Sequence, residues 1–354
     1  MSAEGSAGGT LPGATAGDPA TSAEPLAASA ASRPDGSGRP DRPARVPWPA
    51  VGAYLVVAFG LAWLVALPLW LDGGLSNPFA PVILIAMMFT PTAGALVAVF
   101  LVQRPRPRSV PEYLGMWPLR PVWRLIGLTL AGIFGSIAIS VAAVFLAAAT
   151  GAVRLDLSGF SGFAEIVQRE LTAAGVQGGL PLPVGVLVAV QLLTIPFAAL
   201  LNGFATVGEE LGWRGWLLPS LRPLGTWPAL LISGAIWGLW HSPLILLGYN
   251  FGEPNLLGVL LMTLGCTAYG VLIGWLRLRS GSVWPAVFAH GAFNASAGIG
   301  VLLLAAGSPA SPFALLPLGW TGWIVCTVIA VVLVLCGQFR RQPTLVRRRP
   351  LPER

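Results

Sequence analysis

Eight long apolar stretches divide most of this 354-residue chain and limit what it can fold into. Each is close to the roughly 20 residues that an α-helix needs to cross about 30 Å of hydrocarbon. Only 10% of the residues are charged, against roughly 25% in a typical soluble domain. We therefore predict an all-α polytopic membrane protein, a bundle of about eight transmembrane helices. The predicted spans cover residues 48–71, 79–103, 123–149, 188–218, 226–247, 255–276, 282–305 and 313–337.

Arginine positions predict how these helices are oriented. All 21 basic residues are arginine, and they concentrate before the first span, in every second connection and after the last span. Cytoplasmic loops are enriched in basic residues, so we predict that both termini are cytoplasmic. The same distribution explains the net charge of +7 without nucleic acid as a partner; the partner is the lipid bilayer. Abundant Ala, Gly and Pro with no lysine suggests a bacterial source, and hence a plasma membrane location.

The chain has three predicted regions. Residues 1–46 have almost no large apolar side chains, so we predict a disordered N-terminal tail. Residues 47–337 form the membrane domain, and 338–354 form a basic cytoplasmic tail. Three cysteines lie in apolar runs without disulfide or metal-binding spacing, and we expect them to be buried; they are Cys266, Cys326 and Cys336.

Two adjacent acids and an arginine interrupt the fourth apolar stretch. Charges at bilayer depth are costly and normally face a partner or a water-filled cavity. On a helix, Glu210 and Arg214 are four residues apart and share a face, whereas Glu209 is rotated by about 100°. We therefore expect Arg214 to pair with Glu210, in a supporting role, and to leave Glu209 free for another function.

The chain has only two histidines, and both fall within predicted spans. His241 ends an aromatic segment in the fifth, while His290 and Asn294 lie four residues apart on one face of the seventh. Counted from the predicted cytoplasmic ends, Glu209 and both histidines are about 12–22 Å deep. Small residues surround them and permit close helix approach; these are Gly203, Ala205, Gly208, Gly212, Gly234, Ala235, Gly238, Gly291, Ala292 and Ala295.

These polar groups together suit the activation of water. A carboxylate can take a proton from water while an imidazole holds the same water or a metal ion. A second imidazole with an amide can stabilise the oxyanion that forms when water attacks a peptide carbonyl. Each group alone has a simpler interpretation as an interhelical hydrogen bond, and we interpret Gln191 and Asn202 in that way. We favour a shared site because several costly groups converge at one depth.

The three motifs, Glu-Glu-x-x-x-Arg, aromatic-x-x-x-His and His-x-x-x-Asn, resemble those of the CPBP family of intramembrane proteases. This family includes CAAX prenyl proteases and bacteriocin-processing and self-immunity proteins. The resemblance covers residues 188–305 and implies an eight-helix bundle whose site opens toward the cytoplasm. It further implies that Glu209 activates water with His241, while His290 and Asn294 form the oxyanion site. Trp237 departs from the pattern, since the family more often has phenylalanine there.

The resemblance leaves the chemical type of protease open. Such proteins are described both as metalloproteases and as metal-free glutamate proteases. Glu209, His241 and His290 would supply three ligands to a divalent metal such as zinc with an open fourth position. The expected partner is a membrane-tethered peptide or protein substrate. Two alternatives stay open at this point: a non-catalytic immunity or scaffold protein that binds a peptide in the same cavity, and a transporter, against which the lack of internal repeats argues.

Overall fold

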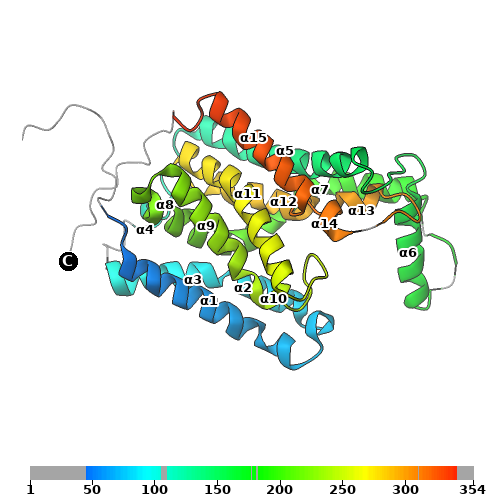
Figure 1. Ribbon diagram of the computed structural model, residues 1–354, viewed down its shortest axis with the longest axis horizontal. Helices are drawn as coiled ribbons and strands as arrows, with labels where there is room; N and C mark the ends of the chain where they lie inside the picture. The colour runs from blue at the N-terminus through cyan, green and yellow to red at the C-terminus, as the bar shows by residue number, and fades with distance from the viewer. Residues whose placement is uncertain (1–44, 105–109, 177, 181, 310, 341–354) are drawn as a thin grey trace, which may run out of the picture. The chain divides into compact units, whose positions relative to one another are not determined.

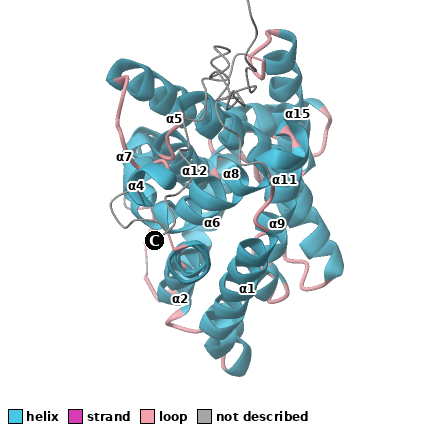
Figure 2. Cartoon of the chain, turned by 90° about the vertical axis from the view of Figure 1, so that its left-hand side faces the viewer, coloured by secondary structure: helices cyan, strands magenta, loops and turns pink. Residues whose placement is uncertain are grey.

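Long apolar helices account for seven of the eight predicted spans. The computed structural model describes residues 45–104, 110–176, 178–180, 182–309 and 311–340. Within these ranges, seven helical stretches are long and apolar enough to cross a membrane, and a single isolated bridge between Leu155 and Leu304 is the only β pairing. Figure 2 shows this all-helical architecture. Nearly all of the predicted N-terminal tail, and residues 341–354 of the basic tail, lie outside the described residues.

The bounds of the seven stretches follow the predicted ones closely. The first is α1, Trp48–Leu71, and the second joins α2, Ala80–Met88, to α3, Thr90–Val97, and the π-helical η2, Ala98–Gln103. The third is α5, Val122–Ala149. The fourth begins with α7, Val184–Glu210, and continues through η4, Leu211–Leu217, α8, Leu218–Leu221, and η5, Arg222–Leu224. The remaining three are α11, Leu256–Ser280; α12, Trp284–Ser296, with α13, Ile299–Leu303; and α14, Pro312–Leu315, with α15, Trp320–Leu335. Short elements connect them: η1, Gly74–Ser76, and α4, Val110–Tyr113.

The one remaining predicted span, the fifth (226–247), is a broken helix in the structure. α9 covers Thr226–Trp240, which is 15 residues, and α10 covers only Ser242–Ile245. Pro243 explains the break, because proline has no amide hydrogen to donate to the carbonyl oxygen of Leu239, four residues earlier. The break leaves His241 at the C-terminal end of α9 instead of inside a continuous helix.

The helices that carry the predicted site residues pack directly against one another. α12 packs against both α7 and α5, and α11 packs against α9. Gly291 makes the contact between α12 and α7 possible, because a Cβ there would lie only 2.5 Å from the carbonyl oxygen of Ala199. The expectation that small residues permit close helix approach is thereby confirmed at this contact.

Large apolar side chains cover the outside of these helices. Leu71, Phe204, Leu256 and Leu335 are 77–81% exposed. Such a surface is unusual for a soluble protein and suits contact with lipid. The interior contains buried aromatic side chains. Among them, Tyr54 stacks on Trp216 with ring centroids 4.9 Å apart. Cys266 and Cys326 are buried as predicted, but Cys336 is exposed, because it follows the last residue of α15.

The connection between α5 and α7 contains a helix that the sequence did not predict. This helix, α6, covers Ser161–Ala173 and runs across the direction of α5 and α7 in Figure 1. Its Phe163 is buried, whereas Glu165, Arg169 and Glu170 are exposed, a pattern typical of a helix at the membrane surface. Just before it, hydrogen bonds from Ser161 and from backbone amides lower the pKa of the Asp156 carboxyl below its usual range.

Candidate active site

The two adjacent glutamates lie at the last residues of α7, directly before a π-helical turn. Glu210 accepts a hydrogen bond from Arg214 Nη1 at 2.9 Å, as the spacing of four residues predicts. Both side chains are at most 1% exposed. Breaking a buried ion pair on one side typically costs about 3–5 kcal/mol, because the remaining charge has no partner. Short π-helical segments are frequent at functional sites because they redirect side chains.

Glu209 faces a different partner. Its Oε2 accepts a hydrogen bond from Trp237 Nε1 of α9 at 2.7 Å, and its side chain is almost fully buried. The Trp237 ring also lies against Arg214, whose Cζ is 4.4 Å from the ring centroid, and its edge meets His290 at 5.1 Å between centroids. Trp237 therefore lies between the Glu209 carboxylate and the Arg214 guanidinium and contacts both.

The His241 ring has a fixed tautomer. Its Nδ1 lies 2.9 Å from the carbonyl oxygen of Trp237. A carbonyl oxygen can only accept, so Nδ1 carries the hydrogen and Nε2 presents its lone pair. This lone pair can accept a hydrogen bond from water or bind a metal ion.

His290 on α12 contacts the second glutamate. Its Nδ1 lies 3.0 Å from Glu210 Oε1, the same oxygen that accepts from Arg214. The carboxylate thus accepts from Nδ1–H, and it fixes the orientation of the imidazole with Nε2 on the opposite side of the ring. The sequence predicts a supporting role for Glu210 next to Arg214 but not this contact, because the side-chain directions of two different helices determine it.

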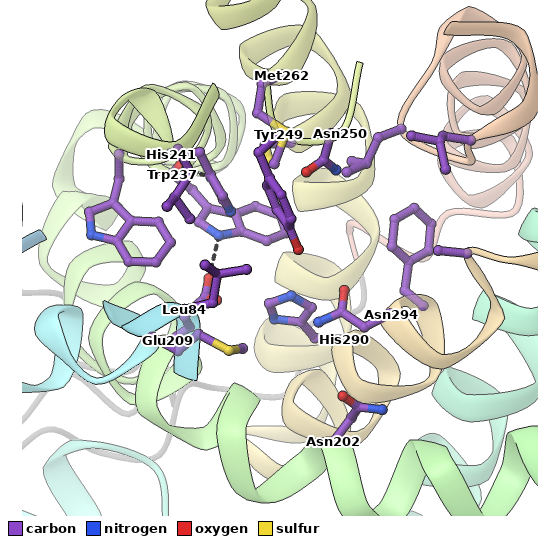
Figure 3. A pocket seen from close by; sticks show the side chains of 18 of the residues that line it. Leu84, Asn202, Glu209, Trp237, His241, Tyr249, Asn250, Met262, His290 and Asn294 are labelled. Atoms are coloured by element: carbon purple, nitrogen blue, oxygen red, sulfur yellow. Dashed lines mark hydrogen bonds between the residues drawn. The ribbon is translucent and has the colours of Figure 1, made fainter. Parts of the chain in front are cut away.

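A cavity of about 460 Å³ brings the predicted site residues together (Figure 3). Glu209, His241, His290 and Asn294 line it, from α7, the end of α9 and α12. In Figure 3, His290 and Asn294 lie side by side, and Glu209 faces them across the space below Trp237. Glu210 and Arg214 do not line the cavity; they lie buried behind it.

The polar cavity residues Asn202, Tyr249 and Asn250 were not predicted to belong to the site. Asn202 of α7 was expected to bond to another helix, but its Nδ2 donates to Ala198 of its own helix, and its side chain lines the cavity. Tyr249 and Asn250 come from the turn after α10. Burial raises the pKa of the Tyr249 hydroxyl above its usual range, and the nearby Glu209 charge adds to this, so the hydroxyl stays a donor. No motif distinguished these residues, because a turn's position relative to other helices is not visible in sequence.

The three potential metal ligands, Glu209, His241 and His290, all line the cavity. Among the described residues, no group of three or more His, Cys, Asp or Glu side chains has an arrangement that could hold a metal ion. One candidate ligand, Glu209 Oε2, already accepts from Trp237, and Glu210 accepts from His290.

Comparison with known proteins identifies similarity in this part of the chain. Residues 190–296 match the family model described as type II CAAX prenyl endopeptidase Rce1-like. This range contains every predicted site residue, from Glu209 to Asn294. The chain is also 32% identical over 81 residues to a CAAX prenyl protease 2 from Methanococcus maripaludis. That match covers 22% of this chain and 30% of the archaeal protein, so it spans under a third of the relative's length.

Proposed function

We propose that this chain, whose residues 190–296 match the type II CAAX prenyl endopeptidase Rce1-like model, is an intramembrane endopeptidase. It hydrolyses a peptide bond in a membrane-tethered peptide or protein. The observation that carries the proposal is the convergence of Glu209, His241, His290 and Asn294 on one cavity. Carboxylate, imidazole and amide groups in one cavity are the set needed to activate water and to stabilise an oxyanion.

Glu209 and His241 would position and activate the water. The free carboxylate oxygen of Glu209 and the Nε2 lone pair of His241 are both acceptors, so they can hold the two hydrogens of one water molecule. The water's own lone pair is then free to attack the carbonyl carbon. Glu209 takes the proton as the new C–O bond forms, and it returns this proton to the leaving amine as the C–N bond breaks.

His290 and Asn294 would stabilise the tetrahedral oxyanion. The Asn294 amide donates one hydrogen bond to it. His290 donates from Nε2, which requires a proton on both ring nitrogens, with Nδ1–H directed to Glu210 at 3.0 Å. Glu210 is then a positioning residue for His290, and Arg214 holds Glu210 in place at 2.9 Å.

Comparison of membrane-protein termini in two cell populations tests this function. Cells that express the wild-type chain are compared with cells that express Glu209→Ala, and new N-termini are identified by mass spectrometry. We expect termini that depend on Glu209, because removal of a general base typically costs about 10²–10⁴-fold in rate. Glu170→Gln, an exposed carboxylate on α6, is the matched control and retains them.

A non-catalytic immunity or scaffold protein would give a different result. Its phenotype would survive in Glu209→Ala cells, and no terminus would depend on Glu209.

The sequence also predicts a bound divalent metal such as zinc, and we keep this as a separate proposal. Elemental analysis of the purified wild-type and His241→Ala proteins tests it, because a resident metal bound by His241 would give a stoichiometric content that the variant loses.

A further inference from the structure

Tyr269 of α11 is buried next to the cavity without lining it. Its hydroxyl donates a hydrogen bond to the backbone carbonyl oxygen of Ala289 on α12 at 2.8 Å. The hydroxyl has only one hydrogen, so its second contact, with Ser136 Oγ of α5 at 2.8 Å, is donated by the serine. This single hydroxyl therefore joins three helices, α5, α11 and α12.

The ring of Tyr269 contacts both sides of the candidate site. It stacks on Phe293 of α12, with ring centroids 3.8 Å apart and ring planes at 15°, and Phe293 lines the cavity. Its centroid also lies 6.5 Å from that of Trp237, the indole that donates to Glu209. The ring thus packs against the helix that carries the proposed oxyanion groups and against the side chain that holds the proposed base.

The contacts of Tyr269 on α12 lie directly beside the proposed oxyanion residues in the chain. Its hydrogen-bond acceptor, Ala289, precedes His290. Its stacking partner, Phe293, precedes Asn294. A shift of α12 at these points moves both oxyanion side chains, and a misplacement of about 1 Å can cost about 100-fold in rate.

We propose that Tyr269 is a positioning residue for the oxyanion side of the site. Its hydroxyl and its ring hold α12 so that His290 and Asn294 face Glu209 across the cavity. Tyr269 acts through α12 and does not contact the substrate, because it lies outside the cavity lining. This inference rests on the proposed function, and it adds a residue of α11 that none of the three sequence motifs contains.

Tyr269→Phe tests the hydroxyl alone, because this variant keeps the aromatic ring. The fold keeps a second polar contact between α5 and α12, where Ser140 Oγ and Ser296 Oγ lie 2.7 Å apart. The matched control is Tyr54→Phe. Tyr54 is also buried and stacked on another ring, but its hydroxyl has no hydrogen-bond partner among the described residues.

Hydrogen exchange of the α12 peptide 284–296, measured by mass spectrometry in detergent, shows how firmly α12 is held, and it needs no catalysis. We expect exchange in this peptide to be about 2- to 10-fold faster in Tyr269→Phe than in the wild-type chain, the effect of one lost hydrogen bond. In Tyr54→Phe it stays unchanged. Wild-type exchange in Tyr269→Phe would overturn the proposal.

Peptidase kinetics distinguish positioning of the oxyanion groups from general support of the fold. We expect kcat of Tyr269→Phe to fall by about 2- to 10-fold with KM unchanged. In an Asn294→Ala background the same substitution has a smaller effect, because one of the positioned groups is already absent. An equal loss in both backgrounds would overturn the positioning role. If the wild-type chain cleaves nothing, the proposed function fails, while hydrogen exchange still decides whether Tyr269 holds α12.

Discussion

Glu209 and Glu210 are neighbours in the chain, yet their carboxylates bind different groups. Glu209 accepts from the Trp237 indole and faces the cavity, whereas Glu210 accepts from Arg214 and His290 behind it. On a helix, adjacent side chains diverge by about 100°. The Glu209 carboxylate is therefore available to react, while the Glu210 carboxylate supports the site. Arg214 and Glu210 lie four residues apart, so the local spacing was sufficient to predict their pairing.

Isosteric amide variants distinguish the two roles. We expect Glu209→Gln to abolish turnover with little loss of thermal stability, because glutamine still accepts from Trp237 and removes a buried charge. We expect Glu210→Gln to lower the thermal midpoint, because it leaves Arg214 buried without an ion partner, at a cost of about 3–5 kcal/mol. Thermal unfolding in detergent and a peptidase assay measure both. Equal destabilisation by the two variants would contradict this division.

Trp237 positions the proposed base. Trp237→Phe keeps an aromatic ring but removes the 2.7 Å hydrogen bond to Glu209. Hydrogen bonds to charged groups contribute about 1.5–3 kcal/mol, so we expect kcat to fall by about 10- to 100-fold with KM little changed. The matched control is Trp216→Phe, which removes a hydrogen bond to Gln103 outside the cavity. An unchanged kcat in Trp237→Phe would exclude this positioning role.

At the scale of elements, helix breaks and close contacts locate the site residues. The end of α9 before Pro243 places His241 at the cavity, and the π-helical η4 follows directly after Glu210. The approach of α12 to α7 then brings His290 to Glu210. Sequence patterns predicted that these helices exist and that small residues line their contacts. They did not predict the break in the fifth span or the helix α6.

The contact between α12 and α7 can be tested at one glycine. Gly291→Ala places a Cβ 2.5 Å from the Ala199 carbonyl oxygen, and overpacking of this kind typically costs about 1–3 kcal/mol. We expect a lower thermal midpoint together with reduced activity, because His290 lies on the displaced helix. Gly135→Ala on α5 is the control, since no atom lies within 4 Å of its added Cβ. Comparable stability of the two variants would show that the contact tolerates a methyl group.

For the whole molecule, the lining of the cavity determines which substrates fit it. Among the described residues that line it, most are apolar and Glu209 is the only acidic one. We expect a membrane-anchored reporter with a short apolar segment beside its transmembrane helix to be cleaved. The same reporter with acidic residues in that segment is expected to stay intact, because a second negative charge would be buried beside Glu209 without a partner. Immunoblots of wild-type and Glu209→Ala cells measure this, and equal cleavage of the two reporters would contradict the expected preference.

The sequence by itself determined the fold class, the helices and the chemistry available to them. Hydrocarbon thickness sets the length of each span, and the cost of buried charge makes Glu209, Glu210 and Arg214 conspicuous in an apolar run. Local spacing also predicted the Glu210–Arg214 pair. Only the tertiary structure decided that His290 contacts Glu210, that Trp237 bonds to Glu209, and which residues line the cavity. These contacts join residues 28 to 80 positions apart, and their geometry depends on how whole helices pack, which no local pattern encodes.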